Sequence, residues 1–153
     1  MKSSIHENNP LPFPVAANVV IEQGDLVCVA ANSAVASTAV AWNTNIAATQ
    51  EDVHDALFGV SLDAHSATAK AGNITVATTG IHTFTCSDEV AKAAGTFYGV
   101  AKASGNATLQ TVVSVATANL EVGTLVYPKA ANATSVKLQM RGTIPTGGPI
   151  SPA

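Results

Sequence analysis

The sequence has 153 residues, a formal net charge of −3 at pH 7, and charged residues make up only 11% of it. A chain of this length forms one domain of ordinary size, whose core needs neither disulfides nor a metal. The seven basic residues are scattered, whereas a nucleic-acid-binding protein needs a concentrated cationic face. No apolar run approaches the roughly 18 residues of a membrane span. We therefore expect neither nucleic acid nor a membrane as a partner.

Thr, Ser, Asn and Gly take the place of the missing charges. A polar surface with few ionised groups loses little free energy when neighbours cover it, because ionised groups are the costly ones to desolvate. This composition favours a protein that is packed in an assembly, although compositional drift explains it equally well.

The first 16 residues are expected to form an extended arm outside the domain. Prolines at alternate positions exclude a helix and an interior strand of a sheet. Two large apolar side chains lie between them and could anchor the arm on a neighbouring subunit or coat protein. The predicted partner-docking residues are Pro10, Leu11, Pro12, Phe13 and Pro14. Removal of residues 1–14 is expected to leave the domain folded.

Residues 17–143 show the pattern of an all-β domain, with about nine short strands separated by turn signals. The segment 134–141 alternates most regularly, with Val136, Leu138 and Met140 on one face and polar residues on the other. The predicted fold is a β-barrel or β-tulip-like domain. A weak echo of Gly, a small polar residue and two large apolar residues occurs at Gly24, Gly95 and Gly123, but its spacing is too irregular for a solenoid.

One segment, residues 49–57, has a helical period instead. Thr49 is the expected N-cap, acidic residues follow in the first turn, and Val53, Ala56 and Leu57 form an apolar stripe. We expect a short helix packed across one end of the barrel, with His54 on its solvated face. Trp42, just before it, is expected to anchor the helix. Residues 144–153, IPTGGPISPA, are expected to be a flexible tail.

The N-terminal sequence MKSSIHENNPLPFP has no apolar core of a secretion signal, so we expect synthesis in a reducing host cytoplasm. Cys28 and Cys86 each lie in an apolar, strand-like run. Both are expected to be buried free thiols, with a disulfide or a metal site as the less favoured alternative.

No catalytic motif is present. Residues 59–63 fail the G-x-S-x-G pattern at the last position, and no glycine-rich phosphate loop precedes a helix. The histidines have no metal-ligand spacing except His82 and Cys86, whose alternation with Phe84 is more typical of packing. We expect no enzyme, no catalytic, cofactor-binding or metal-binding residues, and no cofactor.

The order of several segments resembles the small decoration, or cement, proteins of tailed-bacteriophage heads. The resemblance covers most of residues 15–143 and rests on IEQGDLVCVA (21–30), WNTNIAATQEDVHDALFGVSLDA (42–64), ITVATTGIHTFTC (74–86), VGTLVYPKA (122–130) and ATSVKLQMRGT (133–143). It implies a compact β-barrel or β-tulip on the surface of an icosahedral virion capsid. It further implies a homotrimer that binds the major capsid protein and stabilises its junctions, with an N-terminal arm over neighbouring subunits.

Three other function classes remain open at this point. Another virion component, such as a head fibre base or a tail protein, would differ in copy number per particle. A soluble carbohydrate-binding module would need exposed aromatic platforms, for which Trp42, Tyr98 and Tyr127 are the main candidates. A hydrolase is the third class, and the sequence offers no motif for it.

Overall fold

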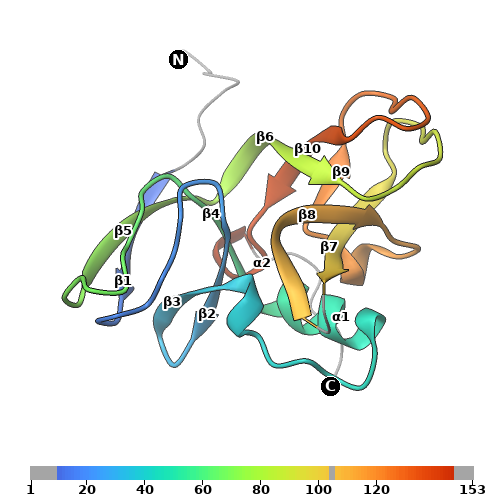
Figure 1. Cartoon of the computed structure of the whole chain (residues 1–153). Helices are drawn as coiled ribbons and strands as arrows, with labels where there is room; N and C mark the ends of the chain where they lie inside the picture. Colours follow the sequence, from blue (N-terminus) through green and yellow to red (C-terminus); the bar gives the residue numbers. More distant parts are fainter. Residues whose placement is uncertain (1–9, 104–105, 147–153) are drawn as a thin grey trace, which may run out of the picture.

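The computed structural model describes residues 10–103 and 106–146, and these form two closed five-stranded β-barrels (Figure 1). The first barrel consists of β1 (Pro10–Val15), β2 (Leu26–Ala30), β3 (Ser33–Ala36), β4 (Leu57–Ser61) and β5 (Gly72–Ala77). The second consists of β6 (Thr79–Cys86), β7 (Phe97–Ala103), β8 (Asn106–Ser114), β9 (Gly123–Leu125) and β10 (Ser135–Arg141). The predicted all-β class with one short helix is confirmed, but the strands close into two barrels rather than one.

The remaining elements connect these strands. They are η1 (Ser37–Ala39), α1 (Ile46–Ala56), η2 (Ala118–Leu120) and α2 (Thr143–Thr146). Residues 144–146, expected in a flexible tail, belong instead to the turn of α2, and residues 147–153 lie outside the described part of the chain. Neither helix in that part is long and apolar enough to cross a membrane.

The two barrels have the same topology. The strand order is β1-β3-β2-β4-β5 in the first and β6-β8-β7-β9-β10 in the second. In each, the first and third strands pair in parallel, and the other neighbours pair antiparallel. The second barrel is therefore a structural repeat of the first, with five strands in the same arrangement.

Matching glycine turns extend the repeat to individual residues. Gly24 and Gly95 immediately precede the residue before β2 and β7, and both have a positive φ, of 92° and 87°. Their amides donate to corresponding carbonyls, Ser61 in the first barrel and Leu125 in the second, both at 2.8 Å. The irregular glycine echo in the sequence thus includes two equivalent turns, where glycine adopts the left-handed conformation at low cost.

A second pair of glycines lies where the fourth strand crosses the fifth. A Cβ on Gly59 would overlap the backbone carbonyl of Ala77 in β5, and a Cβ on Gly123 would lie 2.9 Å from the carbonyl oxygen of Gln139 in β10. Each position needs glycine because the neighbouring backbone approaches too closely for a side chain.

The proline-rich segment belongs to the first barrel, which corrects the prediction of a free arm. Residues Pro10–Val15 form β1 and pair with β5 along their whole length, from Pro10↔Ala77 to Val15↔Gly72. An antiparallel partner receives amide hydrogen bonds from alternate residues only. All three prolines can therefore occupy positions at which an N–H would point away from β5. The positions that donate to β5 are then those of Leu11, Phe13 and Val15. Residues 1–9 lie outside the described residues.

The helix is longer than predicted and begins earlier. Asn45 is the N-cap, and its side chain accepts a hydrogen bond from the amide of Ala48 at 3.0 Å. Thr49, the expected cap, is buried inside the helix, and its hydroxyl donates to the carbonyl of Asn45 at 2.9 Å. The acidic residues consequently fall after the first turn. Val53 and the C-cap Leu57 are buried, as the predicted stripe requires.

Two hydrophobic clusters form the core. One fills the first barrel and includes Val15, Val27, Phe58 and Val76. The larger one combines the interior of the second barrel with residues from β2, α1 and β4, among them Leu26, Val53 and Leu57. Both faces of β2 and β4 are therefore buried, one inside the first barrel and the other against the rest of the molecule.

Polar contacts join α1 to the second barrel, below which it lies in Figure 1. The side-chain amide of Gln50 donates to the carbonyl of Val100 at 2.8 Å. His54 Nδ1 lies 2.6 Å from the carbonyl oxygen of Glu121, and the ring is buried, so the prediction that His54 lies on a solvated face is wrong. Hydrogen bonds, rather than the apolar stripe alone, hold this helix in place.

Candidate functional site

The predicted docking residues lie on β1, where their exposure follows the strand's alternation. Pro10, Pro12 and Pro14 are exposed, whereas Phe13 is half-buried and Val15 is buried. Leu11 lies on the same face of the strand as Phe13 but is 43% exposed. This segment can offer a partner three prolines and the Leu11 side chain, while Phe13 is engaged in the barrel.

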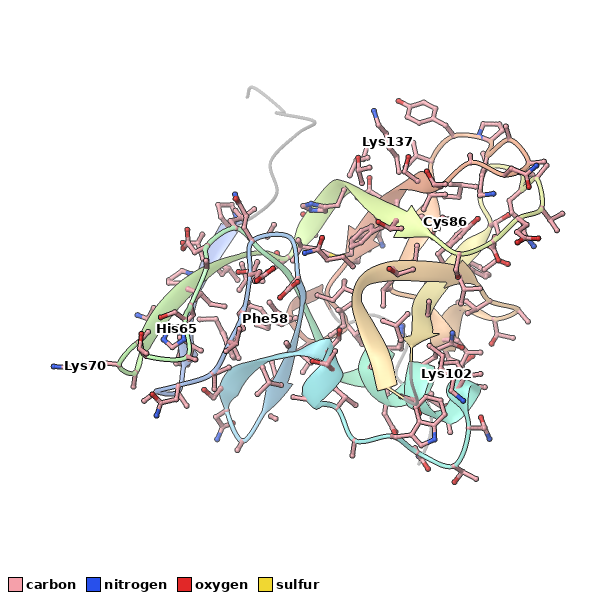
Figure 2. The ribbon with its side chains drawn as sticks, viewed as in Figure 1. Phe58, His65, Lys70, Cys86, Lys102 and Lys137 are labelled. Carbon is pink, nitrogen blue, oxygen red and sulfur yellow. The ribbon has the colours of Figure 1, made fainter. Side chains whose placement is uncertain are left out.

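The outer face of β6 and β10 is a second exposed surface, which we call the Tyr127 face. Register pairs on it place Ile81 beside Gln139, Thr83 beside Lys137 and Thr85 beside Ser135. All six of these residues are exposed. The face is rich in hydroxyl and amide groups, and Lys137 projects from it into solvent (Figure 2).

A shallow hollow of about 260 Å³ lies at the end of this face. Its lining residues come from β6, the segment around β9 and β10: Thr83, Leu125, Tyr127, Pro128, Lys129, Ser135, Val136 and Lys137. Tyr127 is 60% exposed, and Ile81 on β6 is 44% exposed. A tyrosine offers a rigid apolar ring with a polar tip, which is why this residue is enriched at protein interfaces. The hollow is therefore suited to a protein surface with both apolar and hydrogen-bonding groups.

The first barrel carries a larger hollow of about 450 Å³ between its β1–β2 and β4–β5 loops. Val20, Ile21, Glu22, Ala64, His65, Ser66, Ala67 and Ala69 line it. Val20 is 53% exposed, whereas Ile21 is fully buried. The short bridge between Ile21 and His65 closes this end of the barrel, with amide hydrogen bonds of 3.0 and 2.8 Å in the two directions.

His65 itself is buried and has carbonyl oxygens at both ring nitrogens. Nδ1 lies 2.6 Å from the oxygen of Val19, and Nε2 lies 3.0 Å from the oxygen of Lys70. These two hydrogen bonds raise the pKa of His65 above its ordinary value, although burial acts in the opposite direction. Both ring nitrogens can donate only when the imidazole is protonated.

The two thiols are buried and free, as predicted. Burial raises the pKa of Cys28 to about 12, so its nucleophilic thiolate is scarce near neutral pH. Cys86 lies 4.0 Å from the hydroxyl of Tyr98. Burial, together with the neighbouring Cys86 and Asp88, raises the pKa of Tyr98. These groups form a packed part of the core.

The histidine nearest to Cys86 on the same strand is His82. Burial lowers its pKa, and its ring lies 6.5 Å from the ring of Phe84, centroid to centroid. Among residues 10–103 and 106–146, no group of three or more His, Cys, Asp or Glu side chains is arranged to hold a metal ion.

The three aromatic candidates for sugar stacking have different environments. Tyr98 is fully buried. Trp42 is half-buried, and the Lys102 ammonium lies 4.8 Å from the centre of its ring, so the indole contacts the second barrel through β7. Tyr127 remains as an exposed ring, and it lies at the edge of the hollow described above.

The sequence indicates Tyr127 only as one of three candidate sugar platforms, and it assigns His65 no role. β9 ends at Leu125, so Tyr127 lies in the irregular segment that follows it, directly before Pro128. Nothing in the local sequence of His65 indicates its two carbonyl partners. No protein-family model matches this chain, and no curated protein matches it either.

Proposed function

We propose that this chain is a non-enzymatic structural protein of a bacteriophage virion that binds the outside of the assembled icosahedral capsid. In this role it stabilises junctions between copies of the major capsid protein and acts as a homotrimer. The proposal starts from the resemblance to decoration proteins, and the compact all-β fold is the part of that expectation which the structure shows.

The Tyr127 face is the observation that carries the proposal. It combines an exposed tyrosine and isoleucine with hydroxyl and amide groups, next to a shallow hollow. Such a surface can bury apolar area against a coat protein while losing little free energy by desolvation, because few ionised groups are present on it. Tyrosine is also among the residues that contribute most to binding when an interface covers them.

The β1 segment is proposed as a second contact. Its prolines have a fixed φ, so this strand loses little further conformational freedom when a partner covers it. Leu11 supplies an exposed apolar side chain for such a contact. The docking role thus belongs to a strand that is already part of the first barrel.

Co-sedimentation with capsids that lack the chain tests this proposal. Tyr127→Ala and Leu11→Asp should each reduce occupancy at limiting protein, whereas Ile144→Asp serves as the matched control. Ile144 is 48% exposed and lies on α2, which packs against α1 and β4 and belongs to neither proposed contact. Wild-type occupancy by all three variants would contradict docking through these surfaces. Sedimentation equilibrium of the free protein tests the trimer separately.

The exposed ring of Tyr127 also favours a second candidate, a carbohydrate-binding protein. Sugar rings stack on exposed aromatic side chains, and hydroxyl groups from Thr83 and Ser135 line the same hollow. NMR titration with a panel of bacterial surface oligosaccharides distinguishes the two functions. Chemical-shift changes centred on the Tyr127 face at millimolar sugar would support glycan binding.

A further inference from the structure

We propose that His65 is a pH-operated clamp on the first barrel, at a position that Lys129 occupies on the second. The clamp consists of His65 and the two carbonyl groups that it joins, those of Val19 and Lys70. When protonated, the imidazole ties the segment before the Ile21 bridge to the turn around Lys70. This inference does not depend on the proposed function.

The two carbonyl partners of His65 make its hydrogen bonds depend on the protonation state of the ring. A neutral imidazole has one N–H donor and one nitrogen lone pair, whereas the imidazolium has two donors. Since both partners of His65 are carbonyl oxygens, the neutral ring would place a lone pair against one of them. Deprotonation must therefore break or weaken one of the two hydrogen bonds, because one carbonyl oxygen then has no N–H donor from the ring.

The second barrel has a lysine, Lys129, at the position equivalent to His65. Lys129 lies at the position of His65, because its backbone forms the matching bridge with Lys92, at 2.9 and 3.0 Å. Its ammonium donates at 3.2 Å to the carbonyl of Val90, which precedes Lys92 by two residues as Val19 precedes Ile21. It also donates at 3.2 Å to the carbonyl of Ala130. Both barrels thus place a buried nitrogen-bearing side chain on equivalent backbone, next to a carbonyl group two residues before the bridge.

The charged groups around His65 do not replace its carbonyl partners. Glu22 lines the same hollow. The carboxylate of Asp25 accepts from the amide of Glu22 and from Gln110, and that of Asp63 accepts from the amide of Thr75. The Lys70 side chain points away from the barrel, while His65 lies within it (Figure 2). Protonation is therefore coupled mainly to the two carbonyl contacts.

The direction of the pH effect follows from the raised pKa of His65. The folded state binds the proton more tightly than the unfolded chain, so the clamp contributes its full stability below about pH 6.5, the ordinary value for histidine. This contribution is lost as the pH rises through the higher folded value. The wall of the hollow formed by residues 64–69 should then open more often.

Amide hydrogen exchange read by NMR tests the clamp. The amides of Ile21, His65 and Ala69 each donate a backbone hydrogen bond within the segments that carry the ring and its two carbonyl partners. Their protection factors, corrected for intrinsic exchange, should fall about tenfold or more between about pH 5.5 and pH 8.5, because a hydrogen bond from a charged donor is lost. A ring titration of His65 in the same samples should give a midpoint above 6.5.

Two substitutions make the test specific. His65→Lys places the residue of the second barrel in the first, and should abolish the pH dependence of protection at Ile21. Lys129→Gln should lower the protection of Lys92 and Lys129 equally at both pH values and leave the response of the first barrel unchanged. Wild-type protection factors that stay constant across the titration would overturn the proposal, as would a His65 midpoint below 6.5. An undiminished pH response in His65→Lys would overturn it as well.

Discussion

The ring of Phe13 in β1 lies 4.1 Å from the ring of Phe58 in β4, centroid to centroid, with an angle of 38° between the ring planes. Phe58 is buried in the first barrel, so this contact joins the proline-rich segment to the core. The segment has consequently become part of the fold, and its loss affects stability.

Phe13→Ala should therefore destabilise the protein. A fully buried phenylalanine costs about 3–5 kcal/mol on truncation, and about 2 kcal/mol is expected here because Phe13 is only half-buried. Leu11→Ala, on the same strand but more exposed, should cost less than about 1 kcal/mol. Urea unfolding of the two variants measures both values. Equal midpoints for Phe13→Ala and wild type would show that β1 is dispensable for the fold.

A second prediction concerns β10, where alternate residues are buried. Leu138→Ala should cost about 2–5 kcal/mol, since it removes a fully buried side chain and leaves a cavity. Gln139→Ala, on the exposed face, should change the free energy of unfolding by less than about 0.5 kcal/mol. A denaturant titration in which the two variants behave alike would contradict the observed alternation.

The repeated glycines give a third prediction. Gly59→Ala and Gly123→Ala each place a methyl group against the backbone of the neighbouring strand, so each should cost about 1–3 kcal/mol or more. Gly72 is the matched control, because a Cβ there would lie 3.9 Å from the Lys70 carbonyl oxygen, which is an ordinary van der Waals contact. Thermal unfolding should rank Gly72→Ala close to wild type. A Gly59→Ala variant as stable as Gly72→Ala would be inconsistent with this backbone contact.

Thiol reactivity provides the fourth prediction. Because burial raises the pKa of Cys28 to about 12, this thiol should remain unreactive toward a disulfide reagent at pH 8 in the folded protein. In denaturant, Cys28 and Cys86 should both react, giving two thiols per chain under non-reducing conditions. Rapid labelling of native Cys28, located by peptide mapping, would contradict its burial.

Local pattern was sufficient to predict the strand class, but not its closure into two barrels. The period of two at Val136, Leu138 and Met140 directly indicates a half-buried strand, and the structure confirms it. Barrel closure depends on pairings between distant segments, such as β1 with β5, which no local period records. The repeat left only the weak glycine echo in the sequence, because the feature shared by the two barrels is backbone geometry at Gly24 and Gly95 rather than a run of similar side chains.

The two misplaced features have identifiable physical causes. Alternate prolines favour an unpaired arm, yet a strand whose partner needs only alternate donors accepts them. Thr49 is the expected helix start because its side chain can cap a helix. In the structure Asn45 is the cap instead: its backbone is extended and its side chain accepts a hydrogen bond from the amide of Ala48. Tertiary strand pairing decided the first case, and a competing local cap decided the second.

The proposed capsid role is tested most directly by quantitative mass spectrometry of purified virus particles, with the major capsid protein as the internal standard. The proposal predicts that the chain is abundant and present in a fixed ratio to the coat protein, as a repeated decoration of the whole shell requires. Absence from purified particles, or a few copies per particle as expected for a tail or fibre component, would contradict it.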